Sequence, residues 1–111
     1  MPEHLFPPST PQVSAKRAEL APETQQAFRA FSKQVFAEGA LSGKTKQLIA
    51  VAVAHVTQCP YCIRSHTESA QKSGASPEEI TEAIWVAAEM RAGAAYAHSG
   101  IALDAMGLLK E

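Results

Sequence analysis

The apolar residues from Pro22 onward recur at helical spacing, which predicts an all-α protein. Phe28, Phe31 and Val35 occupy positions i, i+3 and i+7, so their side chains share one face of a helix. Pro22 suits the first turn of that helix, because an amide hydrogen there would have no intrahelical partner. The stripe ends near Gly39, in the turn "EGALSG".

The next segment, "KTKQLIAVAVAHVTQ", supports two interpretations. Its "VAVAHV" portion alternates with period two, as a strand does. The alternate residues are alanines, however, which favour a helix, and the run from Lys44 to Gln58 is longer than most strands. We therefore predict a helix, with Ser42 as its N-terminal cap.

Proline, serine and glycine mark the later helix boundaries. Pro60 suits a first helical position and leaves Cys59 at the N-cap, and Gly74 suits a left-handed C-cap. A capping box begins at Ser76 in "SPEE", ahead of apolar residues at positions 80, 83, 84, 87 and 88. Gly93 is a candidate break before "AAYAHSGIALDAM". We expect a bundle of about five helices.

Residues 1–20 contain four prolines and little periodicity. Since each proline fixes its φ angle and removes a hydrogen-bond donor, we expect an extended N-terminal arm there and a helical domain over 21–111. The arm has two interpretations: a disordered tail, or a segment that lies on a neighbouring subunit and is anchored by Leu5 and Phe6.

Composition and charge narrow the function classes. The 111 residues suit one domain, and 46% hydrophobic with 19% charged residues is ordinary for a soluble globular chain. The formal net charge is −1, and the scattered Lys and Arg form no basic patch, so we expect no nucleic-acid partner. The N-terminus lacks the pattern of a signal peptide, and no apolar run is long enough to span a membrane. We expect a cytoplasmic protein without membrane contact.

Two cysteines, three residues apart, are the candidate chemistry. In a cytoplasmic chain this spacing indicates redox catalysis or metal binding rather than a structural disulfide. Cys59 and Cys62 fall at a predicted helix N-terminus, which lowers thiol pKa values, and His66 follows on the same helical face. His66 can therefore act as a base toward a cysteine nucleophile. We assign Cys62 as nucleophile and Cys59 as resolving thiol, although the spacing permits the reverse.

Other interpretations of "HVTQCPYCIRSH" differ in what they require. A glutaredoxin also carries CPYC, but no strand candidate follows Cys62, which excludes that fold. A zinc site would use Cys59, Cys62, His66 and His55, at a spacing unlike common zinc modules. Both thiols could also be small buried hydrophobes. His55 itself suits a core position better than an accessory role beside the thiols.

The segment from "KTKQLIAVAVAHVTQCPYCIRSHTESAQK" through "SGASPEEITEAIWVAAEMRAGAAYAH" resembles the carboxymuconolactone decarboxylase family, and within it the alkylhydroperoxidase D branch. The resemblance covers residues 41 to about 106. It implies an all-α fold, assembly as trimers or hexamers, and a CxxC pair that cycles between dithiol and disulfide. It also implies that Cys62 forms the sulfenic acid, that Cys59 is its partner and proton donor, and that His66 is the motif histidine.

The chain departs from that branch at two positions. The branch has a relay glutamate twelve residues before the first cysteine, where this chain has Gln47. Glutamine forms hydrogen bonds but does not exchange a proton at neutral pH. Tyr61 stands where alkylhydroperoxidase D has a second relay histidine. Activation of the cysteine thiols would then depend on His66 and the helix N-terminus, with Gln47 and His55 as candidate accessory residues.

The predicted function is a thiol-dependent peroxidase or disulfide reductase. It would act on a hydroperoxide or disulfide, take electrons from an external dithiol, and pass them where needed to a peroxiredoxin, with no cofactor or metal. A decarboxylase-like lyase of the same fold and a non-catalytic metal-binding oligomer are the alternatives. The C-terminal half is apolar on more than one face, which predicts a homo-oligomer. Trp85 and Tyr96 are candidates for subunit contacts or for a pocket wall.

Overall fold

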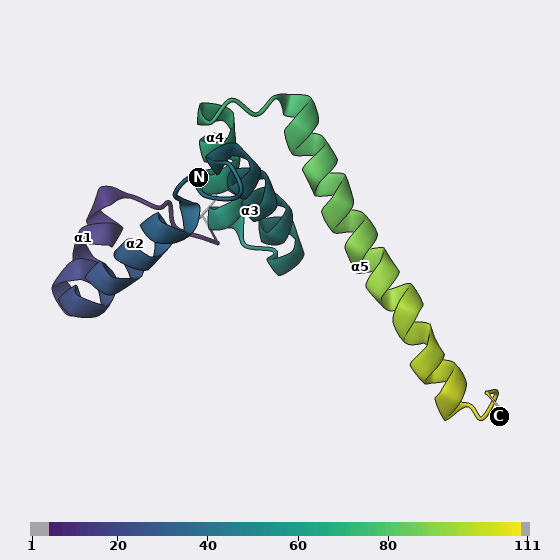
Figure 1. Ribbon diagram of the computed structural model, residues 1–111. Coiled ribbons are helices and arrows are strands. Elements are labelled where there is room, and N and C mark those ends of the chain that lie inside the picture. The colour runs from purple at the N-terminus through teal and green to yellow at the C-terminus, as the bar shows by residue number, and fades with distance from the viewer. Residues whose placement is uncertain (1–4, 110–111) are drawn as a thin grey trace.

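The computed structural model describes residues 5–109, and within this range it is built from helices alone (Figure 1). The all-α prediction is confirmed, and the strand-like "VAVAHV" is helical. The five helices of the described range are α1 (Pro11–Leu20), α2 (Pro22–Phe36), α3 (Gly43–Thr57), α4 (Pro60–Lys72) and α5 (Pro77–Ala105).

Local side-chain caps start α3 and α5 where the sequence predicted them. The Ser42 hydroxyl accepts the Thr45 amide hydrogen at 3.1 Å and starts α3. Ser76 and Glu79 form the full capping box at the start of α5, with 3.1 and 2.9 Å bonds. Gly74 has a φ of 95° after α4, a left-handed conformation that glycine adopts without strain. These boundaries depend only on contacts within a few residues.

Two expectations about the helices were wrong. Residues 11–20 are not extended but form α1, because Pro11 takes the first helical position and Thr10 caps the helix by accepting the Val13 amide hydrogen. Gly93 breaks nothing, and α5 runs for 29 residues without interruption. An isolated glycine costs about 1 kcal/mol relative to alanine, which the long flanking helix offsets. The described range contains five helices, as expected. One of them is the unexpected α1, and α5 is a single helix where the sequence suggested a break.

The core lies where α3 meets α4 and the first turns of α5. Val51 at the centre of α3 is completely buried, and α4, the connection to α5 and the start of α5 close around it. The buried cluster and its partly buried neighbours are Val51, Ala70, Ala75, Ile80, Leu48 and Ile84. This core is small for a chain of 111 residues, and much of it is alanine.

The chain is far from spherical. Its radius of gyration is 19.1 Å, whereas a compact domain of this length has about 13 Å. The far half of α5 extends away from the other helices, as Figure 1 shows. Along this part the large apolar side chains are exposed: Tyr96 by 83% and Ile101 by 69%. None of the helices described over residues 5–109 is both long and apolar enough to cross a membrane.

Replacing the capping serine tests how much of the fold its local contacts stabilise. Ser76→Ala removes the acceptor for the Glu79 amide hydrogen and should lower the free energy of unfolding by about 1 kcal/mol. Urea denaturation followed by circular dichroism measures the loss. Ser65→Ala, at an exposed position within α4, is the control and should change stability little. Equal losses in the two variants would contradict the assigned role of the cap.

Candidate functional site

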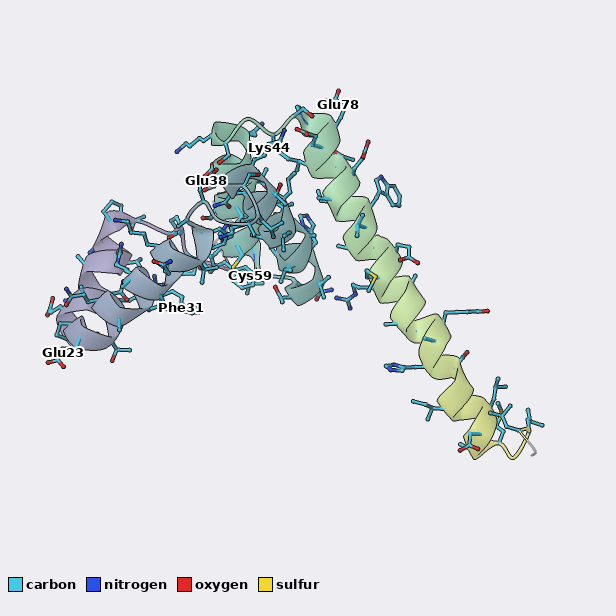
Figure 2. All side chains as sticks on the ribbon, in the orientation of Figure 1. Glu23, Phe31, Glu38, Lys44, Cys59 and Glu78 are labelled. Atoms are coloured by element: carbon cyan, nitrogen blue, oxygen red, sulfur yellow. The ribbon has the colours of Figure 1, made fainter. Side chains whose placement is uncertain are left out.

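The two thiols meet at the first turn of α4. Pro60 begins the helix and Cys59 is its N-cap, with the Cys59 Sγ accepting the backbone amide hydrogen of Cys62 at 3.3 Å. The sulfur thus does what a serine or aspartate oxygen does in most helices. The two Sγ atoms lie 2.7 Å apart, and both cysteines are free. A disulfide between them can close with little movement of the backbone. Cys59 is labelled in Figure 2, with sulfur in yellow.

The hydrogen bond between the two thiols shifts their pKa values in opposite directions. The Cys62 thiol and the backbone amide hydrogens of Cys62 and Tyr61 lower the pKa of Cys59 below the usual thiol value. Donating to Cys59, together with burial, raises the pKa of Cys62. The first thiolate of the reduced pair therefore forms on Cys59, at the helix end where the backbone dipoles favour negative charge.

His66 lies one turn beyond Cys62 and is held from two sides. Its Nδ1 is 2.8 Å from the Oε1 of Gln47 on α3. The ring of Phe36, the last residue of α2, stacks on the imidazole with centroids 5.1 Å apart and planes 24° apart. Both contacts join residues from different helices. The imidazole orientation is therefore set by how α2, α3 and α4 pack.

Lys46 fixes the end of α2 beside this site. Its ammonium donates to the backbone carbonyl oxygens of Val35 and Ala37, at 2.9 and 2.6 Å. Val35 lies in the last turn of α2 and Ala37 is its C-cap, and carbonyl oxygens at a helix C-terminus have no intrahelical donor. Phe36, between them, is thereby held over His66. Sequence reasoning missed both Lys46 and Phe36, because nothing in their local pattern indicates a partner ten or thirty residues away.

A pocket of about 330 Å³ opens beside the thiols, a volume within the range of small-molecule sites. Cys62 and His66 both line it, and Cys59 does not. Its walls come from the end of α2 and one side of α3, and hydrocarbon makes up almost all of them. The other lining residues are Val35, Phe36, Lys46, Ile49, Ala50, Val53, Ala54 and Thr57. No hydrogen bond joins Cys62 to His66 within the described residues.

The remaining candidates lie elsewhere. His55 is not a lining residue, and its Nδ1 pairs with the carbonyl oxygen of Val51 in its own helix at 2.7 Å. Tyr61 turns toward the N-terminal segment, where its hydroxyl donates to the carbonyl oxygen of Pro7 at 2.6 Å and Phe6 packs edge-on at 6.0 Å. Within residues 5–109, no three His, Cys, Asp or Glu side chains are arranged to hold a metal.

Comparison with known proteins places this arrangement in a family. The sequence model of the carboxymuconolactone decarboxylase family matches residues 22–105, which include α2 to α5 and the whole pocket. The chain belongs to the carboxymuconolactone decarboxylase family. The match covers more than the part from residue 41 on which the resemblance was noted, and it begins at the proline that starts α2.

Two relatives share most of their length with this family member. "Uncharacterized protein 4 in cox locus" of Paracoccus denitrificans is 60% identical over 98 residues, covering 86% of this chain and 88% of that protein. An uncharacterized protein of Haemophilus influenzae is 42% identical over 89 residues, covering 80% and 79%. These identities show the shared family and no particular activity.

Two crystal structures have the same fold. A protein from Methanobacterium thermoautotrophicum matches with a TM-score of 0.71 and 37% identity, over 75% of this chain and 93% of that one. The apo form of a carboxymuconolactone decarboxylase family protein from Legionella pneumophila matches with a TM-score of 0.67 and 35% identity, over 86% and 87%.

Removing the Cys62 thiol tests whether its hydrogen bond lowers the pKa of Cys59. Cys62→Ala eliminates the S–H donor to Cys59, so the pKa of Cys59 should rise toward the ordinary thiol value. The pH dependence of iodoacetamide labelling of Cys59 measures this shift. Cys62→Ser keeps a hydroxyl donor in place and is the matched control, with a smaller rise expected. A Cys59 labelling midpoint that is the same in both variants would contradict the hydrogen-bond account.

Proposed function

We propose that this family member is a thiol-dependent peroxidase or disulfide reductase of the alkylhydroperoxidase D type. The observation that carries the proposal is a close pair of free thiols at a helix N-terminus, one of which lines an apolar pocket together with a histidine. A hydroperoxide or disulfide with an apolar substituent suits these walls, because its hydrocarbon part is removed from water on entry.

The pocket supports Cys62 as the thiol that attacks the substrate. The resting thiolate on Cys59 accepts the Cys62 proton along their shared hydrogen bond, and the Cys62 thiolate then attacks the terminal oxygen of the hydroperoxide. The O–O bond breaks, Cys62 becomes a sulfenic acid, and the alkoxide takes a proton to leave as an alcohol. Cys59 then attacks the Cys62 sulfur, forming the disulfide and releasing the sulfenic oxygen as water.

The oxidised pair requires an external reductant to complete the cycle. A dithiol supplies two electrons by thiol–disulfide exchange, and no metal or organic cofactor takes part. A peroxiredoxin is the proposed partner where the protein relays electrons instead of reducing peroxide itself. Free thiols in such a cycle suit the reducing cytoplasm.

We also propose that the protein works as a homo-oligomer, a trimer or hexamer as in the family branch it resembles. The chain exposes 8929 Å² of surface, whereas a folded monomer of 11.8 kDa exposes roughly 5,900 Å². The excess of about 3,000 Å² is in the range that permanent oligomers bury. Trp85 and Tyr96 do not line the pocket and are 69% and 83% exposed, which favours subunit contacts for both.

Mass spectrometry of the single-cysteine variants tests the assigned chemistry. With limiting cumene hydroperoxide, Cys59→Ser should accumulate a sulfenic acid on Cys62, because no thiol remains to resolve it. Cys62→Ser should accumulate little, and the wild type should form an intramolecular disulfide. The reverse pattern would exchange the two roles. Metal analysis of the same sample is the control, since stoichiometric zinc on the thiols would contradict the redox proposal altogether.

A charge on the far half of α5 tests the oligomer. Ile101→Asp places a carboxylate on an apolar side chain that is 69% exposed in the single chain, and burying that charge in an interface costs several kcal/mol. Multi-angle light scattering should show a loss of the oligomer toward a mass of 11.8 kDa. Gln71→Asp adds the same charge at an exposed position of α4 and should leave the mass unchanged. A wild-type protein that is monomeric in solution would contradict the proposed homo-oligomer.

A further inference from the structure

We propose that Gln47 is a positioning residue that holds His66 in the neutral tautomer protonated on Nδ1, which makes Nε2 the basic atom of the site. The tautomer is a property of the folded protein, whether or not it reduces peroxides. Its use in catalysis rests on the proposed function, and the experiments below separate the two.

The contacts of His66 leave its ring little freedom. The Gln47 Oε1 lies 2.8 Å from Nδ1, at the edge of the ring, and Phe36 stacks on its face. A carbonyl oxygen has lone pairs and no hydrogen, so the hydrogen of this bond must be on Nδ1. In a neutral imidazole the other nitrogen then carries the lone pair. Gln47 and His66 are both partly buried. Their hydrogen bond is stronger there than in water, which strengthens the preference for the tautomer protonated on Nδ1.

An amide at this position acts differently from a carboxylate. A carboxylate beside Nδ1 would pair with a doubly protonated imidazolium and stabilise it before any substrate arrives. The amide accepts the same hydrogen bond but has no net charge, so it orients the ring without charging it. His66 then remains able to accept a proton. The glutamine therefore keeps the histidine a base, whereas a glutamate would favour an acid.

The proton moves as follows in the proposed cycle. When Cys59 is neutral, Nε2 of His66 takes the thiol proton of Cys62, either directly or through a group in the pocket, which leaves a thiolate and an imidazolium. The thiolate attacks the hydroperoxide, and the O–O bond breaks to leave a sulfenic acid and an alkoxide. The imidazolium returns its proton to that alkoxide. The bond from Nδ1 to Gln47 is present throughout, so the tautomer is restored at the end.

Nitrogen-15 NMR of the reduced wild-type protein observes the tautomer directly. At a pH where His66 is neutral, its Nδ1 should give a protonated, pyrrole-type signal and its Nε2 an unprotonated, pyridine-type signal. His55 is an internal reference, because its Nδ1 donates to a backbone carbonyl oxygen, which has no alternative orientation. A His66 protonated on Nε2 would overturn the proposal, since the amide group of Gln47 would then be donating.

Substitutions at Gln47 test whether the amide causes this state. Gln47→Leu removes the acceptor at similar size, and His66 should become a mixture of tautomers. Gln47→Glu keeps an acceptor but adds charge, and both nitrogens of His66 should be protonated at a pH where the wild-type ring is neutral. Circular dichroism confirms that each variant is folded. Retention of the wild-type tautomer in folded Gln47→Leu would show that the packing against Phe36 suffices, and would overturn the assignment.

Reactivity of Cys62 links the tautomer to function. In a Cys59→Ser background, Gln47→Leu should slow the reaction of Cys62 with iodoacetamide and with cumene hydroperoxide by about tenfold, as expected for losing one hydrogen bond that orients a base. Unchanged rates would overturn the positioning role. If the hydroperoxide fails to react even without the Gln47 change, while the alkylation and NMR results hold, the peroxidase function fails and the role of Gln47 stands.

Discussion

The first turn of α4 depends on one sulfur atom. An α-helix begins with amide hydrogens that have no partner within the helix, and here Cys59 provides the acceptor for that of Cys62. The group that caps the helix is thus the same group that becomes a thiolate. Pro60 contributes by removing one amide hydrogen and fixing the backbone after the cap. Helix geometry then places the second thiol within reach of the first, so the fold and the proposed chemistry share their atoms.

Helix α3 connects this turn to the rest of the site. Its buried face carries Val51 and Ala54 into the core, and another face provides Gln47 to His66 and most of the pocket wall. Lys46, next to Gln47, holds the end of α2 through two carbonyl oxygens. A single helix therefore contributes both to the core of the domain and to the orientation of the histidine. We expect substitutions of the buried residues of α3 to displace the thiols, because packed interiors transmit small displacements.

The chain has more apolar surface than its own fold can cover. Its core is a small cluster around α3, while α5 continues past it with exposed side chains such as Tyr96 and Ile101. Helices in folded proteins owe most of their stability to tertiary packing of their apolar faces. We therefore regard the single chain as one part of a larger proposed assembly, in which α5 supplies the contact surface while α3 and α4 hold the reactive groups.

What the sequence determined by itself was local. Ser42, Cys59 and Ser76 start their helices as predicted, because a cap is decided by residues three positions apart. The prediction for Pro11 was wrong, because proline disrupts the interior of a helix but is also favoured at its first position. The hydrogen bond of Gln47 with His66, and the stacking of Phe36 on His66, were decided only by the tertiary structure. Those side chains come from three helices, and the relative orientation of packed helices depends on all the contacts between them rather than on spacing along the chain.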